Sequence, residues 1–284
     1  MAVILDGKEL SKKIKENLKD EVDYLKEKGI YPKLAVIMVG NDSSSKIYVK
    51  NKSKACKKVG IEFEEFLLDE SSTEHELLSL IERLNQDEKI NGILLQSPVP
   101  KHIDINKAFR TISPEKDVDG FNPINVGNLV IGEDCFISCT PYGVMKLLEE
   151  YNIEIEGKNA VVLGRSNIVG KPMAQCLLSK NATVTICHSR TQNIKDIVKN
   201  ADIVVSAIGK NNFVTEDMVK QGTVVIDVGI NRLDNGKIVG DVDFENVKEK
   251  ASYITPVPGG VGPMTIAMLL TNLVKATKLK NKEN

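Results

Sequence analysis

The sequence predicts an α/β protein of two domains built on largely parallel sheets. One reason is length, because 284 residues is long for a single compact core. A second is that short apolar runs typical of buried strands alternate with patterns typical of helices, as in parallel-sheet proteins. A third is that this alternation gives way to a loop-rich span, 97–139, and restarts near residue 140. We therefore expect a domain boundary there, and we expect the long loop-rich span to carry function.

The first half predicts three helices and three strands. The helices are expected at 8–28, at 45–59, and at 73–84 behind the cap candidate Ser72. The strands are expected at 34–39, 61–68 and 92–96.

The second half begins with a predicted linking helix at 141–151. Strands are expected at 159–164, 183–187, 202–209 and 223–229, with a helix at 171–180 that has Pro172 in its first turn. An apolar helix is expected from Ile266 to Val274.

Composition excludes several classes of protein. The 38 basic and 39 acidic residues give a net charge of −1, so no basic excess indicates binding to nucleic acid or to an anionic membrane. No apolar run approaches the ~18 residues of a spanning helix, and the N-terminus has no basic leader typical of secretion. The five cysteines are scattered and the three histidines are isolated, so we expect no metal and a reducing, cytoplasmic location.

A glycine-rich loop near the end of the chain has a closely specified backbone. Three glycines and two prolines fall in the six residues Pro258-Gly259-Gly260-Val261-Gly262-Pro263. Glycine permits positive φ and close approach of a ligand, whereas proline fixes φ. The loop either shapes a binding site or is a plain tight connection.

The segment from residue 159 to 187 has the outline of a mononucleotide-binding unit. Strand, glycine turn, helix and strand follow one another, and the turn runs from Gly164 to Gly170. It is not the usual G-x-G-x-x-G pattern, but Gly164 and a helix N-terminus could still receive a pyrophosphate. The alternative is an ordinary connection between strand and helix.

The second strand of this unit indicates which nucleotide would bind. An NAD site usually has an acidic residue at that strand end, whereas this chain has His188-Ser189-Arg190-Thr191. Arg165 lies in the glycine turn, which the fold brings near that strand end. These donors favour NADP over NAD, the alternative being that both arginines are solvated surface charges.

The helix at 45–59 places one lysine apart from the others. On a helical wheel Tyr48, Lys52 and Cys56 share one face with Ala55 and Val59, whereas the other lysines lie opposite. A lysine in a cleft can transfer protons or polarise a reacting group. Equally, its stem can cover apolar surface while the ammonium stays in water.

Two further polar positions follow the third strand. Gln96 stands at its carboxyl end, where α/β sheets bind ligands, and it could orient a lysine or simply cap a loop. Asp117 and Asp119 form an acidic loop without other nearby metal ligands, so we discount a metal site. A single aspartate can bind the N–C–N edge of a heterocycle with its two oxygens, although an acidic turn is the simpler reading.

Taken together, these segments resemble the bifunctional 5,10-methylenetetrahydrofolate dehydrogenase/5,10-methenyltetrahydrofolate cyclohydrolase family through nearly the whole chain. The matching stretches are VGNDSSSKIYVKNKSKAC (39–56), GILLQSPVP (92–100), PEKDVDGFNPINVG (114–127), CTPYGVM (139–145), GRSNIVGKPM (164–173), CHSRT (187–191), DVGIN (227–231) and PVPGGVGPMTIAML (256–269). One departure is Ser97, where the family usually has leucine.

The resemblance implies specific roles. The catalytic set would be Lys52, Tyr48, Gln96 and Asp119, with Tyr48 stacking on the folate, Gln96 tuning Lys52, and Asp119 holding the pterin. The loop of Pro258, Gly259 and Gly260 would border the folate. The NADP-contacting residues would be Gly164, Arg165, Ser166, Ser189, Ile230 and Thr265.

The resemblance also implies the reaction and the architecture. Methylenetetrahydrofolate would give a hydride to NADP⁺, and water would then open the methenyl product to 10-formyltetrahydrofolate without a metal. Residues 1–139 plus 256–284 would form an N-terminal α/β folate-binding catalytic domain, to which the C-terminal helix returns, and 140–255 an NADP-binding Rossmann domain. The family is typically a homodimer. The competing readings are a dehydrogenase without the hydrolase step and a non-catalytic NADP sensor.

Overall fold

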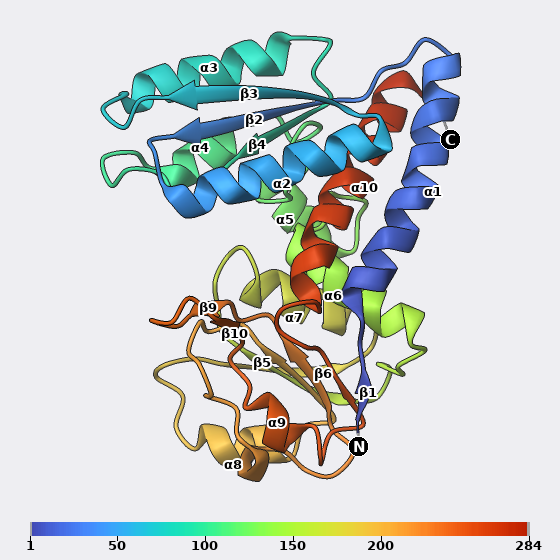
Figure 1. Ribbon diagram of the computed structural model, residues 1–284, viewed down its shortest axis with the longest axis vertical. Coiled ribbons are helices and arrows are strands. Elements are labelled where there is room, and N and C mark those ends of the chain that lie inside the picture. Colours follow the sequence, from blue (N-terminus) through green and yellow to red (C-terminus); the bar gives the residue numbers. More distant parts are fainter. Residues whose placement is uncertain (1, 283–284) are drawn as a thin grey trace. The chain divides into compact units, whose positions relative to one another are not determined.

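The computed structural model describes residues 2–282, which divide into two compact units. The six-stranded unit comprises the chain up to Lys12 together with Ser138–Thr265. The three-stranded unit comprises Lys13–Ile137 and the chain from Ile266 onward. The helices α1 (Gly7–Glu27) and α10 (Val261–Asn281) contribute to both units (Figure 1).

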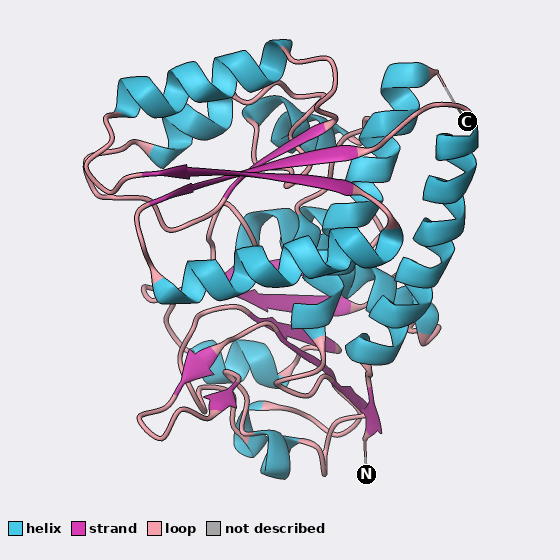
Figure 2. Ribbon diagram, turned by 45° about the horizontal axis from the view of Figure 1, so that its top comes forward, coloured by secondary structure: helices cyan, strands magenta, loops and turns pink. Residues whose placement is uncertain are grey.

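The three-stranded unit is built on the parallel sheet β3–β2–β4. Its strands are β2 (Lys33–Val39), β3 (Glu62–Leu68) and β4 (Gly92–Leu95). Its other helices are α2 (Ser43–Val59), α3 (Glu74–Gln86), α4 (Ile105–Thr111) and α5 (Pro123–Ile131). Helices α2 and α3 lie on opposite faces of this sheet in both views (Figures 1 and 2).

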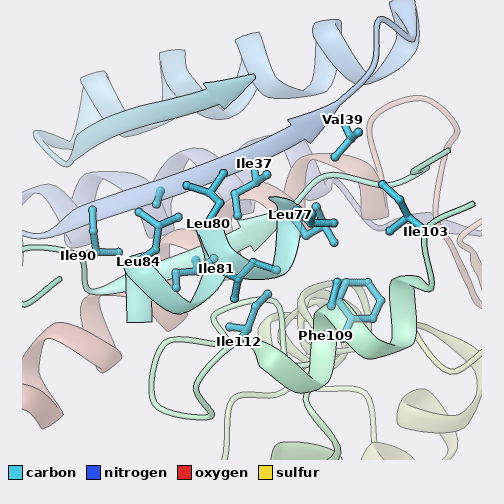
Figure 3. Close-up of a cluster of buried hydrophobic side chains, with 14 residues drawn as sticks. Ile37, Val39, Leu77, Leu80, Ile81, Leu84, Ile90, Ile103, Phe109 and Ile112 are labelled. Carbon is cyan, nitrogen blue, oxygen red and sulfur yellow. The ribbon is translucent and has the colours of Figure 1, made fainter. Parts of the chain in front are cut away.

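Alternate side chains of β2 pack into the hydrophobic core on the α3 side of that sheet (Figure 3). Ile37 and Val39 contact a stripe from α3 that has the spacing of an amphipathic helix. Phe109 from α4 closes the same core and lies 5.0 Å, centroid to centroid, from the ring of Phe121. The α3 stripe consists of Leu77, Leu80, Ile81 and Leu84.

The six-stranded unit contains a parallel sheet in the order β1–β11–β8–β7–β5–β6. The strands are β1 (Val3–Ile4), β5 (Asn159–Leu163), β6 (Thr183–Cys187), β7 (Ile203–Ser206), β8 (Val224–Asp227) and β11 (Tyr253–Ile254). A separate antiparallel pair joins β9 (Asn231–Arg232) and β10 (Ile238–Val239). The helical segments are α6 (Cys139–Glu150), α7 (Gly170–Leu178), α8 (Ile194–Lys199), α9 (Phe244–Val247) and a 3₁₀ turn at Glu216–Met218.

The order of these strands predicts where a ligand binds. The chain passes from β5 to β6 on one side and then returns to β7 on the other side of β5. This is a topological switch point, and α/β sheets bind ligands outside the carboxyl ends of the strands there. The two-domain α/β prediction, with a parallel cofactor-type sheet, is confirmed.

Several sequence-based expectations need correction. Thr73, not Ser72, caps α3, because Thr73 and Glu76 form a reciprocal capping box. The span 97–139 contains two helices, each capped by an Asx side chain that looked like loop sequence: Asp104 for α4 and Asn122 for α5. The last helix begins at Val261, inside the glycine-rich loop.

The observed units differ from the predicted domain boundaries at three segments. The chain up to Lys12, residues 138–139 and residues 256–265 belong to the six-stranded unit. The reason is backbone pairing, since Val3 pairs with Tyr253 and the N–H of Lys8 donates to the carbonyl of Gly259 at 3.0 Å. No helix within residues 2–282 has the length and apolar character needed to cross a bilayer.

Candidate active site

A lysine–glutamine pair forms the centre of the candidate site in the three-stranded unit. Lys52 Nζ donates to Gln96 Oε1 at 2.8 Å. Gln96 is only 8% exposed, and its Nε2 donates to the carbonyl of Ser97 at 2.6 Å. Both ends of the amide are therefore engaged, so the orientation of Gln96 and the direction of the lysine side chain are set together.

Helix α2 positions Lys52 through its ends and its buried face. Asp42 caps the N-terminus by accepting from the N–H of Ser45 at 2.7 Å, and Gly60 ends the helix at φ 84°. Lys52 is half-buried beside the buried face. The five other lysines of the helix, Lys46, Lys50, Lys54, Lys57 and Lys58, are all exposed, as the wheel predicts.

Tyr48 departs from the predicted inward face, because it is 43% exposed. It lies one turn before Lys52 at the edge of the buried stripe, where Ser45 and Val49 take the inward positions. The ring thus keeps an open face on the same side of α2 as the lysine.

Cys56 lies one turn beyond Lys52 and is fully buried. Burial raises the pKa of its thiol to about 12, although the nearby charge of Lys52 acts in the opposite direction. The thiol therefore stays protonated at neutral pH, and Cys56 serves packing under the lysine and not nucleophilic chemistry.

The two aspartates of the acidic loop, Asp117 and Asp119, differ in burial. Asp117 is 1% exposed and its carboxylate accepts from the N–H groups of Phe121 and Asn122 and from Asn125 Nδ2. Burial is the main cause that raises the pKa of Asp117 to about 7. Asp119, in contrast, is half-buried.

The same loop lies beside β4 at one point. Ile93 forms a parallel bridge with Asp117, and the N–H of Ile93 donates to the carbonyl of Lys116 at 2.8 Å. The chain turns directly afterwards, since the N–H of Gly120 donates to the carbonyl of Asp117 at 3.1 Å, and Asp119 stands in this turn. The structure thus brings Lys52 to Gln96 and places Asp119 in the turn that follows the bridge to β4.

The glycine turn after β5 meets the geometric requirements of a nucleotide turn. Gly164 has φ 120°, and a Cβ there would lie 2.4 Å from the carbonyl oxygen of Ala207. A Cβ on Gly170 would lie 2.3 Å from the carbonyl oxygen of Gly164. Both positions need glycine, because the turn folds tightly at the switch point between β5 and β7.

A cavity of about 400 Å³ lies at the carboxyl ends of β5 and β6. This volume is within the range of small-molecule sites. Its lining residues are Leu163, Cys187, His188, Ser189, Ile194, Ile208, Lys210 and Phe213. Of these, sequence reasoning identified only Ser189 as a site residue. Ile208 lies at the end of the strand predicted at 202–209, and Lys210 and Phe213 follow it, so this strand-end position was the available signal.

The remaining predicted cofactor residues also lie in the six-stranded unit. Arg165, Ser166 and Ser189 are exposed, and Ser166 Oγ accepts from the N–H of Val169 and of Gly170 at 3.2 Å. Ile230, just after β8, is 52% exposed. Thr265 Oγ1 lies 3.1 Å from Thr140 Oγ1, so this side chain is held in place.

The glycine-rich loop is fixed by close backbone contacts. Gly259 has φ 114°, and a Cβ on Gly260 would lie 2.7 Å from the carbonyl oxygen of Pro256. A Cβ on Gly7 would lie 1.8 Å from the carbonyl oxygen of Gly260, a requirement that sequence reasoning missed. Pro258 is exposed beside these glycines. The loop is therefore a specified surface of the six-stranded unit and more than a simple connection.

Two domain models of one protein family match most of this chain. Residues 5–119 match the tetrahydrofolate dehydrogenase/cyclohydrolase catalytic domain, and residues 138–281 match the NAD(P)-binding domain of the same family. The chain belongs to the tetrahydrofolate dehydrogenase/cyclohydrolase family. Within residues 2–282, no three His, Cys, Asp or Glu side chains group in a way that could hold a metal ion.

Individual members of the family match over almost their full length. The chain is 60% identical over 279 residues to the bifunctional protein FolD of Campylobacter hominis, covering 98% of each chain. It is 56% identical over 277 residues to FolD of Bacillus subtilis, again covering 98% of each.

Solved structures agree with this relationship. FolD of Campylobacter jejuni superposes with a TM-score of 0.97 at 55% identity, covering 98% of this chain and 99% of that one. The Trypanosoma brucei enzyme, solved with NADP and an inhibitor, superposes with a TM-score of 0.95 at 41% identity, covering 99% of each chain.

Proposed function

We propose that this chain oxidises 5,10-methylenetetrahydrofolate to 5,10-methenyltetrahydrofolate with NADP⁺ and then hydrolyses the product to 10-formyltetrahydrofolate. The observation that carries the proposal is the Lys52–Gln96 hydrogen bond, 2.8 Å long, in a chain that contains both family domains. A module that only sensed NADP would need no such pair.

The six-stranded unit suits a dinucleotide with a 2′-phosphate. The tight turn at Gly164 allows a pyrophosphate to approach the backbone before α7, and the exposed Arg165 supplies a cation in that turn, whereas no acid directly follows β6. When bound, NADP⁺ supplies the acceptor for the hydride. The residues of this unit bind and orient it: Gly164, Arg165 and Ser166 in the turn, Ser189 at the cavity, and Ile230 and Thr265 on the nicotinamide side.

The three-stranded unit binds the folate and carries the hydrolysis. The exposed ring of Tyr48 offers a stacking surface, and the two oxygens of Asp119 suit the N–C–N edge of a pterin. Pro258, Gly259 and Gly260 form a rigid backbone surface of the six-stranded unit, and their contact with the folate stays a prediction.

In the hydrolysis, Lys52 polarises the attacking water and moves its proton, while Gln96 holds the amine in the required direction. The methenyl carbon is already electrophilic because its one-carbon bridge is cationic. The main task of the protein is thus to place a water and a proton carrier, and residues on a helix and a strand end can do this accurately.

We also propose a division of labour and an assembly. As functional domains we keep 1–139 plus 256–284 for the folate and 140–255 for NADP, although the chain up to Lys12, 138–139 and 256–265 pack in the six-stranded unit. The protein acts in the cytoplasm, which fits five free cysteines. A homodimer through the edge strand β6 is supported by the exposure of Thr183, Thr185 and Ile186 on that strand.

An assay with methylenetetrahydrofolate and NADP⁺ tests the proposal. NADPH should form, followed by loss of the methenyl absorbance as 10-formyltetrahydrofolate accumulates. A sensor would give no NADPH, and a dehydrogenase alone would accumulate methenyltetrahydrofolate. Light scattering of the purified protein tests the dimer, and Ile186→Lys should shift it toward monomer.

A further inference from the structure

A fully buried aspartate joins two loops of the six-stranded unit that sequence reasoning did not connect. Asp241 follows β10 and is 0% exposed. Its Oδ2 accepts from Ser206 Oγ at 3.1 Å, from the N–H of Ile208 at 2.9 Å and from that of Gly209 at 3.2 Å. Its Oδ1 accepts from the N–H of Lys210 at 2.8 Å and from Asn231 Nδ2 at 3.0 Å.

A second buried carboxylate holds Asp241 in place. Asp227 Oδ1 accepts from the N–H of Asp241 at 2.9 Å and from that of Gly229 at 2.9 Å, and its Oδ2 accepts from the N–H of Val242 at 2.9 Å. A Cβ on Gly229 would lie 2.2 Å from Asp241 Oδ1. The backbone around the two acids is thus specified by hydrogen bonds and by the absence of a side chain at Gly229.

The donors to Asp241 are backbone N–H groups, one hydroxyl and one amide, so neutral dipoles hold the carboxylate. Burying an acid is costly unless it is hydrogen-bonded, and five convergent donors meet that requirement. What the arrangement provides is a fixed relation between the segment after β7 and the segment after β8.

Both segments belong to the proposed cofactor site. Ile208 and Lys210 line the cavity at the ends of β5 and β6, and Asn231 directly follows Ile230. These two segments are not adjacent in sequence, since 23 positions separate residues 208 and 231. The carboxylate of Asp241 is the point at which they meet.

We propose that Asp241 is a positioning residue for the cofactor: it ties the cavity wall at Ile208–Lys210 to the Ile230 segment and thereby sets the site for NADP⁺ before binding. This rests on the proposed function. A pre-organised site binds more tightly, because less loop ordering has to accompany binding. Asp241 touches no substrate in this scheme and acts through the loops it holds.

Asp241→Asn tests the proposal, with Asp243→Asn as the matched control. The asparagine keeps the shape but turns an amide N–H₂ toward N–H donors, so the Ile208–Lys210 loop should loosen. The KM for NADP⁺ should rise roughly tenfold, since hydrogen bonds to a charged group are worth at least that factor. The carboxylate of Asp243 accepts from Asn246 Nδ2 and not from the Ile208–Lys210 loop, so its variant should keep the wild-type KM.

Asn231→Ala separates the two halves of the proposal. It frees the Ile230 segment but leaves the donors from Ile208 to Lys210 in place. Direct titration should show that adenosine 2′,5′-bisphosphate, a probe for the adenosine end, binds this variant as it binds wild type. The same probe should bind Asp241→Asn several-fold more weakly. Turnover with saturating NADP⁺ should fall for Asn231→Ala.

The outcomes distinguish positioning from stability. If Asp241→Asn and Asn231→Ala are folded and both bind NADP⁺ with wild-type affinity, the inference is wrong. It is equally overturned if dehydrogenase and cyclohydrolase activities of Asp241→Asn fall in parallel with the fraction of folded protein. If the wild type binds NADP⁺ but reduces none, the proposed function fails, whereas the titrations still test the role of Asp241.

Discussion

The two units hold their candidate site residues in different ways. In the three-stranded unit the central groups are long side chains on a helix and a strand end, bonded to each other as Lys52 to Gln96. In the six-stranded unit Arg165, Ser166 and Ser189 are exposed on loops, and the fixed part is the backbone turn at Gly164.

This difference suits the chemistry that we propose for each unit. Proton transfer needs a single atom within hydrogen-bond reach of the reacting group, so the lysine is oriented in advance by a buried amide. Dinucleotide binding uses the backbone at the start of a helix, which the tight glycine turn shapes while Ser166 Oγ accepts from the N–H groups of Val169 and Gly170. Four experiments test this difference between the two units.

Replacing the lysine should have the largest effect. Lys52→Met should reduce methenyltetrahydrofolate hydrolysis by about 10²–10⁴-fold, the usual contribution of a positioned proton carrier. NADP⁺ binding should persist, because the six-stranded unit is unchanged. Lys50→Met, on the exposed side of the same helix, is the control and should hydrolyse at the wild-type rate. Undiminished hydrolysis by Lys52→Met would refute the role of Lys52.

Removing the partner amide should cost less. Gln96→Leu deletes the acceptor of the 2.8 Å bond, so the lysine loses its direction but remains present. Hydrolysis should fall roughly 10- to 100-fold, the range expected for a hydrogen bond to a charged group. Steady-state rates for this variant and for Gln86→Leu, an exposed control, measure the difference. A rate for Gln96→Leu equal to that of Lys52→Met would mean that the two act as one unit.

The buried carboxyl group of Asp117, two positions before Asp119, predicts that the stability of the fold depends on pH. The pKa of Asp117 is about 7 in the folded protein, against 3.8 for an unperturbed group. Between these values the folded state retains a proton that the unfolded state has released, so this contribution is complete below pH 3.8 and is lost as pH rises through 7.

The matching experiment compares wild type with Asp117→Asn by denaturant unfolding at several pH values. From about pH 5 to about pH 8 the wild type should lose roughly 2 kcal/mol of unfolding free energy more than the variant. Asp227 in the six-stranded unit, whose pKa burial raises to about 6, is present in both proteins and cancels. Parallel pH curves would show that Asp117 ionises normally.

The smallest effect is expected at the exposed arginine of the cofactor turn. Arg165→Gln should weaken NADP⁺ binding roughly five- to tenfold, because an exposed cation gains only modest energy from a phosphate. NAD⁺ binding should change less than twofold. Fluorescence titration of both nucleotides, with Lys180→Gln beyond α7 as control, measures the ratio. Equal losses for the two nucleotides would mean that Arg165 does not read the 2′-phosphate.

Local pattern predicted the elements best where one face is buried. The strand at 183–187 has the predicted bounds, and the exposed lysines of α2 follow the helical wheel. Prediction failed where short polar side chains made the local structure, as in the caps Asp104 and Asn122, because such residues favour turns and helix starts alike. Tyr48 was placed on the inward face because a wheel gives direction and not depth of burial.

Sequence alone determined the family, the two-domain α/β class and the residue types that the chemistry requires, because motifs and periodicity are local properties. Which groups meet depends on the tertiary structure: Gln96 meets Lys52, 44 positions apart, and Asp241 meets the segments at Ile208 and Asn231. Such pairings depend on strand order and loop path, which bring distant donors to one buried acceptor. A buried acceptor must find partners wherever the fold supplies them, and the local sequence does not specify where that will be.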